Sequence, residues 1–571
     1  MSMPHQDQKS SASWPWLASY PPGLDWQAPI GTGPVAAMFD ETVARYGDKP
    51  GFDFMGQVLT WGELGQKVDA MAKGLQTLGV HKGTRVGLFL PNCTYFLIAY
   101  YAVLKIGGTV VNFNPLYAPR ELVHQIKDSQ TEVMVTLDLK ILYKKLDDIR
   151  EESGLGKILV CPFADILPFP KSILFPLLKG KDIAHIPDKD YVVWLQDISD
   201  EGHKPNPVDI NPLTDIAVIQ YTGGTTGVPK GAMLSHANVT ANTNQCSAWF
   251  IGAQAGEKML GVIPFFHVFA MTAILNLSVR LGFEIIVPVP RFELDKTLKS
   301  IDKKKPNYFP AVPAIYNAIN NHPKLSHYDL TSLRFCMSGG APLPVEVKKS
   351  FEKNTGCVVV EGYGLTETTP VVCVNPVVGD NKPGSIGLPL PGTIVEIINP
   401  EDKKTPMKIG ERGELCVRGP QVMMGYWGKT QETTDVLKDG RLHTGDIALM
   451  DEQGYFFIVD RIKDLILVNG YNVYPRNVEE AIYLHPAVEE CIVGGLPDAD
   501  RGETVKAWIK PKAGQTLNEE ELKSFLKDKI SPIEMPRQVE IRTQPLPKTM
   551  IGKLSRKDII AEELAKTGHS K

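Results

Sequence analysis

The chain lacks paired cysteines. Its eight cysteines are scattered singly over 571 residues and never form a Cys-x-x-Cys pair. Zinc ribbons need such pairs, and small disulfide-bonded domains need a dense cysteine framework, so both classes are excluded. This cysteine usage favours a reducing cytoplasm.

Long apolar runs are missing as well. The longest clean run, Tyr95–Leu104, has ten residues, about half of the roughly 20 that a membrane-spanning helix needs. It therefore predicts a buried helix. The first residues, MSMPHQDQKSSASWPW, have no cationic segment followed by an apolar one, so we expect no signal peptide and no export.

The chain also has no excess of basic residues. The formal net charge is −4, which gives no global attraction to nucleic acid, so no nucleic-acid partner is expected. What the chain does have is length and 43% apolar residues, enough to bury several cores.

Short β-rich runs alternate with helical patterns through most of the chain. The helical pattern is clear over Glu63–Leu78. This alternation predicts α/β architecture. The expected strands are Val86–Leu90, Thr109–Phe113, Val133–Leu137, Ile216–Gln220 and Glu284–Val289.

A domain boundary is predicted where the apolar run Tyr455–Val459 gives way to the polar segment Asp460–Asp464. The expected division is a large N-terminal domain, residues 1–460, with several α/β subdomains, and a small mobile α+β domain, residues 461–571.

The tail has its own pattern. Strands are expected at Val488–Val493 and Thr504–Lys510, and Thr516 with Glu519 has the spacing of a helix capping box.

The segment Tyr221–Gly231, YTGGTTGVPKG, contains four glycines, three threonines and a lysine in eleven residues. Glycine lets backbone amides approach an anion closely. The apolar residues before it predict a buried strand, and open α/β sheets bind ligands at strand ends. It is not a Walker A loop, because Pro229 precedes Lys230 and Gly231 follows it. Nucleotide binding is the first hypothesis.

Two more polar segments follow expected strands. They are Ser338–Ala341 (SGGA) and Glu361–Glu367 (EGYGLTE), both interpreted as strand-exit loops. Tyr363 offers a flat face for a base, Thr366 a donor to phosphate, and Glu367 an oxygen ligand for Mg²⁺. Three such loops can form one site.

Two turns lie further along the chain. His443–Asp446 (HTGD) places a carboxylate where it can hold ribose hydroxyls, and Lys548–Lys553 (KTMIGK) ends in a lysine at a glycine turn.

Together, in this order, these segments resemble the adenylate-forming superfamily of acyl-CoA synthetases, adenylation domains and luciferases. Within it the chain is most similar to bacterial long-chain fatty acid CoA ligases, from about Phe39 to Leu554. The segments that carry this second resemblance are VNFNPLYAPRELVHQ (Val111–Gln125), EGYGLTE, GPQVMMGYW (Gly419–Trp427) and LHTGDIA (Leu442–Ala448).

The resemblance implies ATP, Mg²⁺ and CoA as cofactor and co-substrates, and it implies a role for each matching residue. Thr226, Lys230, Glu367 and Lys553 would be the catalytic residues, with Lys553 the adenylation lysine and Lys463 the hinge. The nucleotide-binding residues would be Thr222, Gly223, Gly224, Thr225, Thr226 and Lys230 at the phosphates, Gly340, Ala341, Glu361, Gly362 and Tyr363 around adenine, Thr366 and Glu367 at phosphate and Mg²⁺, and Asp446 and Arg461 at the ribose.

The implied chemistry has two steps. A fatty carboxylate is already anionic at neutral pH, so it attacks the α-phosphate of ATP without a general base, provided that cations and amides neutralise the phosphates. The thiol of CoA then attacks the acyl adenylate. The second step needs no phosphate-neutralising lysine, so the small domain is expected to rotate about its hinge between the steps.

The resemblance implies a carboxylic acid as the substrate. In Pro264–Met271 (PFFHVFAM), the chain has His267 where amino-acid-activating relatives usually have an aspartate, which disfavours an amino acid. His267 either lines the mouth of an acyl tunnel or is a packed core histidine. Phe265 and Gly339 are further candidates for contact with the acyl group. Two departures, Gly223 in place of serine and Asn472 in place of arginine, resemble the long-chain subgroup.

Several alternatives stay open. The acid is a long-chain fatty acid or, alternatively, a medium-chain or aryl acid; the acyl acceptor is CoA or a carrier protein. A rival of another class is a non-catalytic fatty-acid binding or uptake protein. It is motivated by Phe163–Lys179, whose apolar residues either touch a membrane or cover their own domain, and whose three prolines are expected to break a regular helix. A homodimer and peripheral contact with the inner membrane also stay open.

Overall fold

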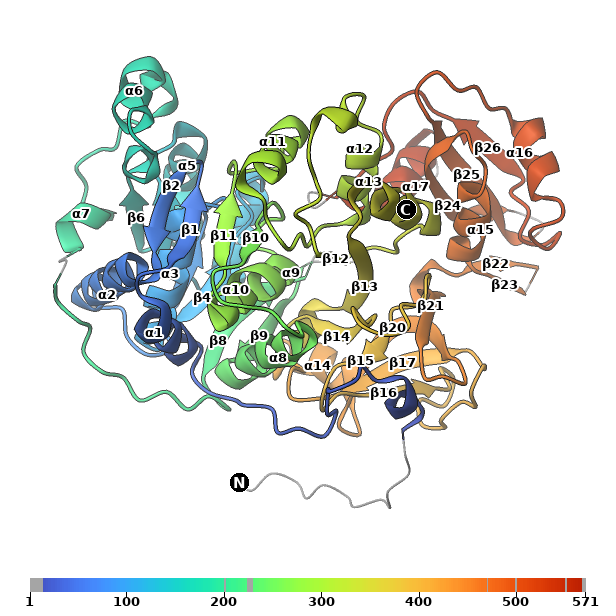
Figure 1. The fold of residues 1–571 in the computed structure, drawn as a ribbon, viewed down its shortest axis with the longest axis horizontal. Coiled ribbons are helices and arrows are strands. Elements are labelled where there is room, and N and C mark those ends of the chain that lie inside the picture. Colours follow the sequence, from blue (N-terminus) through green and yellow to red (C-terminus); the bar gives the residue numbers. More distant parts are fainter. Residues whose placement is uncertain are drawn as a thin grey trace.

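The computed structural model describes residues 14–199, 202–222, 229–469, 471–498, 501–549 and 552–566. Their buried apolar side chains form three hydrophobic clusters. The large one extends from Trp16 to Phe456, the second from Ile466 to Leu526, and a small third one in the same C-terminal part consists of Ile492, Leu496, Trp508, Leu546 and Ile559. Figure 1 shows the corresponding large body, in blue to orange, and a smaller body in orange to red.

The described residues form an eight-stranded sheet in which six parallel strands are followed by two antiparallel ones. Four of the predicted strands lie in it, so those predictions are confirmed. Its order is β18 (Gly425–Tyr426), β9 (Gly231–Ser235), β8 (Ile216–Tyr221), β4 (Thr109–Asn112), β3 (Arg85–Leu88), β5 (Val133–Leu137), β6 (Lys157–Cys161) and β7 (Val192–Trp194).

Two four-stranded sheets lie beside the eight-stranded sheet. Isolated bridges from Tyr308 to Met259 and to Phe335 join these two sheets. The predicted strand at 284–289 is β11. The first sheet is β10 (Lys258–Leu260), β11 (Glu284–Val287), β1 (Pro50–Phe54) and β2 (Gln57–Thr60); the second is β12 (Phe335–Ser338), β13 (Val358–Gly364), β14 (Val371–Val374) and β15 (Leu388–Pro389).

One interpretation needs correction here. The segment EGYGLTE does not begin as a loop, because Glu361–Gly364 continues β13 and pairs with β14. The polar residues therefore sit on a strand, where a backbone ladder fixes their direction.

Helices α1 (Val35–Tyr46), α2 (Trp61–Thr77) and α3 (Thr94–Lys105) contact one another. Helix α3 is buried from Thr94 to Leu104, as predicted from its apolar run. Helix α2 begins with a capping box, in which the Glu63 amide donates to Thr60 Oγ1 at 3.2 Å and the Thr60 amide donates to Glu63 Oε2 at 2.8 Å.

A further sheet in the described residues completes the large body. Its strands are β16 (Ile394–Ile398), β17 (Gly413–Arg418), β20 (Arg441–Met450) and β19 (Leu437–Lys438), and β21 (Phe456–Arg461) also pairs with β20.

The small body has an α+β arrangement, as predicted. Its strands are β22 (Ile466–Val468), β23 (Tyr471–Val473), β24 (Val488–Asp498), β25 (Gly502–Pro511) and β26 (Gln538–Ile541), and its helices are α15 (Pro475–Tyr483), α16 (Glu519–Leu526) and α17 (Arg556–Lys566).

The predicted cap of helix α16 is wrong. The N-cap is Asn518, whose Oδ1 accepts from the Glu521 amide at 2.9 Å. Leu517 is buried in the second cluster immediately before it. The helix therefore starts after this anchor, two residues later than Thr516 would place it.

The remaining described helices connect these layers. They are η1 (Pro15–Ser19), α4 (Pro119–Ser129), α5 (Lys140–Ser153), η2 (Phe163–Ile166), α6 (Lys171–Leu178), η3 (Gly180–Asp182), α7 (Leu195–Ile198), α8 (His236–Trp249), α9 (Val268–Ala270), η4 (Met271–Asn276), α10 (Leu277–Leu281), α11 (Leu294–Lys304), α12 (Pro313–Asn320), η5 (Leu325–His327), α13 (Val345–Thr355), η6 (Thr366–Thr368), α14 (Thr430–Val436) and η7 (Ile462–Asp464).

The expectation that prolines break Phe163–Lys179 is only half right. The first part, η2, is packed into the core, but the second part forms helix α6 with Pro176 inside it. Helix α6 has no buried residue. The carbonyl of Ser172, which loses its helical partner to Pro176, is therefore close to solvent, and the cost of the missing hydrogen bond is small.

No helix in the described part of the chain is both long enough and apolar enough to cross a membrane.

Candidate functional site

The predicted phosphate loop connects β8 to β9. The Thr222 amide donates to the Lys230 carbonyl at 2.9 Å and closes the base of the loop. Both residues are half-buried. The residues predicted at the phosphates between them, Gly223, Gly224, Thr225 and Thr226, lie outside the described residues.

Glu367 lies beside the base of this loop. Its Oε1 accepts from the Tyr426 hydroxyl at 2.6 Å, and the Lys230 ammonium is 5.1 Å from the centroid of the Tyr426 ring. The pairing of β18 with β9 sets this arrangement, because it places Tyr426 opposite Ala232. Burial raises the pKa of Tyr426, with a further contribution from Glu367, so the phenol stays protonated and can donate.

The predicted adenine residues come from two adjacent parallel strands. Ser338 at the end of β12 is opposite Glu361 in β13. The Leu343 amide donates to Glu361 Oε1 at 3.2 Å, which ties the turn after β12 to β13. Burial raises the pKa of Glu361 to about 7. Gly340 has φ of 79°, a conformation that favours glycine in this turn.

Tyr363, Asp446 and Arg461 meet although they are far apart in the sequence. The Tyr363 hydroxyl donates to Asp446 Oδ2 at 2.5 Å, and Arg461 Nε is 3.1 Å from Asp446 Oδ1. Strands β20 and β21 place Asp446 opposite Arg461. The predicted base-binding and ribose-binding side chains therefore share one corner.

Glu414 is a residue of this corner that sequence reasoning missed. Its carboxylate accepts from His443 Nδ1 at 2.8 Å and from the Gly445 amide at 3.0 Å. The expected turn at His443–Asp446 is wrong: these residues lie inside strand β20, where its pairing with β17 shifts register. The hydrogen bonds to Glu414 hold this irregular part of the strand and so orient Asp446. The sequence did offer a signal for this residue, because Glu414 is a charged residue within the apolar strand β17. In the structure it is only 3% exposed.

Glu414, Cys416 and His443 also have ligand-type atoms within 4.8 Å of one another. Because His443 Nδ1 is used in the hydrogen bond to Glu414, and Cys416 Sγ lies 3.4 Å from the same atom, we assign no metal to this trio.

Lys553 reaches the large body from the small one. The Thr549 amide donates to the Lys553 carbonyl at 2.6 Å, and Gly552 has φ of 82°. A Cβ on Gly552 would lie 3.6 Å from Val312 Cγ2, so the turn rests against the large body. Burial lowers the pKa of Lys553 to about 8, the Arg461 charge adds to this effect, and Asp446 opposes it.

His267 faces the same lysine. The Phe269 amide donates to His267 Nδ1 at 3.3 Å, which leaves the ring proton on Nε2. Burial, with the Lys553 charge, lowers the pKa of His267 to about 4, so the imidazole is neutral at pH 7.

The other two acyl-contact candidates differ in their surroundings. A Cβ on Gly339 would lie 3.1 Å from the Phe269 ring, so this glycine permits a close approach between the SGGA turn and the PFFHVFAM segment. Phe265 is fully buried, with its ring 5.7 Å from that of Phe96 and 6.3 Å from that of Phe52. Its contacts are those of a core residue.

The predicted hinge residue Lys463 lies in η7, between β21 of the large body and β22 of the small one. Next to it Arg556 forms ion pairs with Asp464 at 2.7 Å and with Glu479 at 2.8 Å. The Arg476 amide donates to Asp460 Oδ2 at 2.9 Å. Charged contacts therefore flank the connection on both sides, which was not evident from the sequence.

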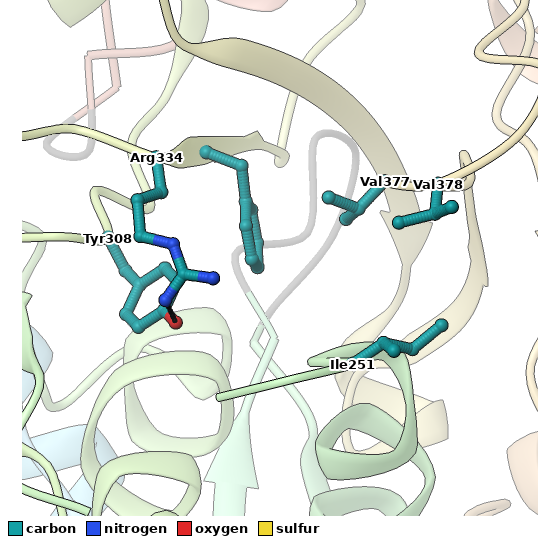
Figure 2. A pocket seen from close by; sticks show the side chains of 6 residues that line it. Ile251, Tyr308, Arg334, Val377 and Val378 are labelled. Atoms are coloured by element: carbon teal, nitrogen blue, oxygen red, sulfur yellow. Dashed lines mark hydrogen bonds between the residues drawn. The ribbon is translucent and has the colours of Figure 1, made fainter. Parts of the chain in front are cut away.

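A separate hollow of about 190 Å³ lies at the edge of β12 and is lined by Ile251, Tyr308, Arg334, Phe335, Val377 and Val378 (Figure 2). Arg334 pairs with Glu257, and its guanidinium is 5.9 Å from the Tyr308 ring centroid. None of the predicted site residues lines this hollow, and we assign it no ligand.

A large α/β body and a smaller α+β body whose Lys553 lies near Asp446, Arg461 and His267 are features expected of the adenylate-forming class of enzymes. The chain belongs to the AMP-binding enzyme family: the family model matches residues 39–427, and the model of the AMP-binding enzyme C-terminal domain matches residues 477–553.

Known proteins resemble the chain over nearly its whole length. It is 46% identical over 96% of its residues to a long-chain-fatty-acid–CoA ligase of Bacillus subtilis, of which it covers 98%. It is 37% identical, with the same two coverages, to a long-chain-fatty-acid–CoA ligase of Escherichia coli O6:H1. Among solved structures, ATP-bound MatB from Rhodopseudomonas palustris matches with a TM-score of 0.80 and 27% identity, over 94% of this chain and all 100% of that one.

Proposed function

We propose that this protein is an AMP-forming long-chain-fatty-acid–CoA ligase. The observation that carries the proposal is the position of Lys553, whose charge acts on Asp446 and Arg461 on one side and on His267 on the other. The predicted nucleotide corner and the predicted acyl region thus share one lysine. The relatives that match 96% of the chain support the same activity.

In the first step, a carboxylate oxygen of the fatty acid forms a bond to the α-phosphorus of ATP, and the bond from that phosphorus to the β-phosphate oxygen breaks. Pyrophosphate leaves with its electrons. The Lys553 ammonium bridges the two reacting anions, while Lys230 and the loop after Thr222 neutralise the outgoing phosphates. No general base is needed, since the acid is already ionised.

Glu367 is suited to serve as a ligand of Mg²⁺. Mg²⁺ prefers carboxylate and phosphate oxygens, and the hydrogen bond from Tyr426 to Oε1 of Glu367 fixes the carboxylate in direction. When bound, the ion supplies positive charge at the phosphates. Glu367 would hold it, with Thr366 adjacent in η6.

The nucleoside is assigned to the corner formed by β13 and β20. Asp446 accepts hydrogen bonds from the ribose hydroxyls and Arg461 holds Asp446 in place. Tyr363, Glu361, Gly362, Gly340 and Ala341 form the surroundings of adenine in this proposal.

In the second step the thiolate of CoA attacks the acyl carbon, and AMP leaves with the electrons of the broken acyl–phosphate bond. The small domain rotates about Lys463, which withdraws Lys553 from the adenylate and opens a path for the CoA arm. The boundary at residues 460–461 and the mobility of the small domain belong to this proposal.

The acyl group is assigned to the place where Gly339 of the SGGA turn approaches Phe269 of the PFFHVFAM segment. His267, neutral with a proton on Nε2, can donate to a carboxylate or phosphate oxygen but offers no negative charge to an ammonium group. A fatty acid suits such a site better than an amino acid. Each methylene that becomes buried contributes about 0.8 kcal/mol, so long chains bind well and neighbouring lengths are poorly distinguished.

The test is CoA thioester formation and AMP release across acids from acetate to oleate, with benzoate and a cinnamate as aryl acids. Highest kcat/KM for long chains supports the proposal. A maximum at medium-chain or aryl acids favours those alternatives, and acyl-AMP formation without CoA-dependent AMP release favours carrier-protein loading. Absence of acid-dependent pyrophosphate–ATP exchange with every acid would favour a non-catalytic binding protein.

The pH dependence of the first step follows from Lys553. Burial lowers its pKa to about 8, so the ammonium is present below that pH and is lost above it. We expect kcat/KM for pyrophosphate exchange to fall by up to about tenfold per pH unit above pH 8. Thioester formation from supplied acyl-AMP should lack this limb. An exchange profile that stays flat to pH 10 would contradict the assignment.

We also propose that the enzyme works in the cytoplasm and contacts the inner membrane peripherally, where its acyl substrates accumulate. A homodimer stays a prediction.

A further inference from the structure

Helix α6 and the turn before it expose an unusual amount of apolar surface. Phe169 is 79% exposed, Leu177 75%, Leu178 74% and Ile173 59%. Solvent-exposed large apolar side chains normally occur singly, and a contiguous group marks an interaction surface. We call the segment from Phe169 to Lys181 the α6 tip.

The α6 tip does not contribute to the core. Phe175 is the side chain that holds it, with its ring 5.1 Å from that of Phe163. Ile173, Leu174, Leu177 and Leu178 have the spacing of one helical face, and this face points away from Phe175. The face is therefore available for contact with a partner.

The segment from Phe163 to Ala184, which contains the α6 tip, is hydrogen-bonded at both ends to Asp138. The Phe163 amide donates to Asp138 Oδ1 at 2.8 Å, and the Ala184 amide donates to the Asp138 carbonyl at 2.7 Å. Figure 1 shows α6 at the outer end of the large body, far from the small one. The α6 tip is a fixed projection rather than a loose loop.

Charge identifies the kind of partner. Lys171, Lys179 and Lys181 border the apolar face, and no acidic residue occurs from Phe169 to Lys181. Lysines around an apolar helix face suit an anionic lipid surface, because the apolar side chains enter the acyl boundary while the ammonium groups stay among the headgroups. A helix of eight residues is about 12 Å long, too short to span a bilayer but long enough to lie in its interface.

We propose that the α6 tip is the surface by which this protein docks on anionic membranes. This rests on the peripheral membrane contact proposed above and is independent of the ligase chemistry, since none of the residues assigned to that chemistry lies in the α6 tip. Docking there holds the enzyme at the membrane without a spanning segment.

The experiment is flotation of the full-length protein with vesicles of equal parts phosphatidylglycerol and phosphatidylcholine. Leu177→Glu with Leu178→Glu should lower the vesicle partition coefficient at least about tenfold, because two apolar contacts are lost and two negative charges face anionic lipid. The matched control is Leu213→Glu with Leu484→Glu, two half-exposed leucines elsewhere, which should float like the wild type. Lys171→Gln, Lys179→Gln and Lys181→Gln together should remove the preference over vesicles of phosphatidylcholine alone.

Three outcomes contradict the inference. A wild type that does not float removes both the membrane contact and the docking surface. Equal flotation of both leucine double variants places docking elsewhere, and a wild-type dimer that the α6 variant converts to a monomer assigns the surface to a second copy of the chain. Pyrophosphate exchange with a water-soluble acid is measured in parallel. It should be unchanged in the α6 variants, and its absence in the wild type would count against the ligase proposal alone.

Discussion

Lys553→Ala should abolish adenylate formation while thioester formation from supplied acyl-AMP survives. We expect pyrophosphate–ATP exchange to fall by about 1,000-fold, since the ammonium stabilises charge that develops only while the acid attacks the phosphate. The second half-reaction, in which Lys553 is withdrawn, should change by less than about threefold. Exchange assays and single-turnover CoA acylation measure the two steps separately.

The matched control is Lys557→Ala, an exposed lysine on the same domain, which should leave both half-reactions at wild-type rates. An equal loss of both steps in Lys553→Ala would contradict the division of labour between the two domain positions. It would indicate that this lysine only supports the structure of the small domain.

Glu367→Gln should lower adenylate formation by on the order of 100-fold to 1,000-fold and weaken the apparent affinity for Mg²⁺. The amide keeps the size of the side chain and can still accept from Tyr426, so the fold should be retained. What is lost is the negative charge that we propose binds the cation. The Mg²⁺ dependence of exchange, and Mn²⁺ binding in the presence of ATP measured by electron paramagnetic resonance, are the two readouts.

Tyr426→Phe should lower adenylate formation less than Glu367→Gln does. It removes the hydroxyl that holds Glu367 Oε1 but keeps the ring beneath Lys230. A loss of about tenfold is expected. Glu401→Gln, at an exposed turn, is the control. If Glu367→Gln leaves Mn²⁺ binding unchanged, the carboxylate is not the metal ligand.

Much of the fold was predictable because strand and helix periods are local. The runs at 109–113 and 133–137 form β4 and β5, and the apolar run at 95–104 lies inside α3. The errors have local causes as well. Asn518 competes with Thr516 as a cap, and the backbone ladder with β14 keeps Glu361–Gly364 in a strand although its residues suggest a loop.

The sequence by itself indicated the kind of chemistry, since glycine, threonine, lysine and carboxylate residues in this order predict a phosphate site with a distant cation. It could not determine which side chains touch. Tertiary structure decided that Tyr363 bonds to Asp446, that Tyr426 holds Glu367, that Glu414 holds His443–Asp446 within β20, and that the apolar face of α6 stays exposed. The reason is physical: residue type and local spacing fix what a group can do, but distance, burial and pKa depend on pairing between strands that lie tens to hundreds of residues apart.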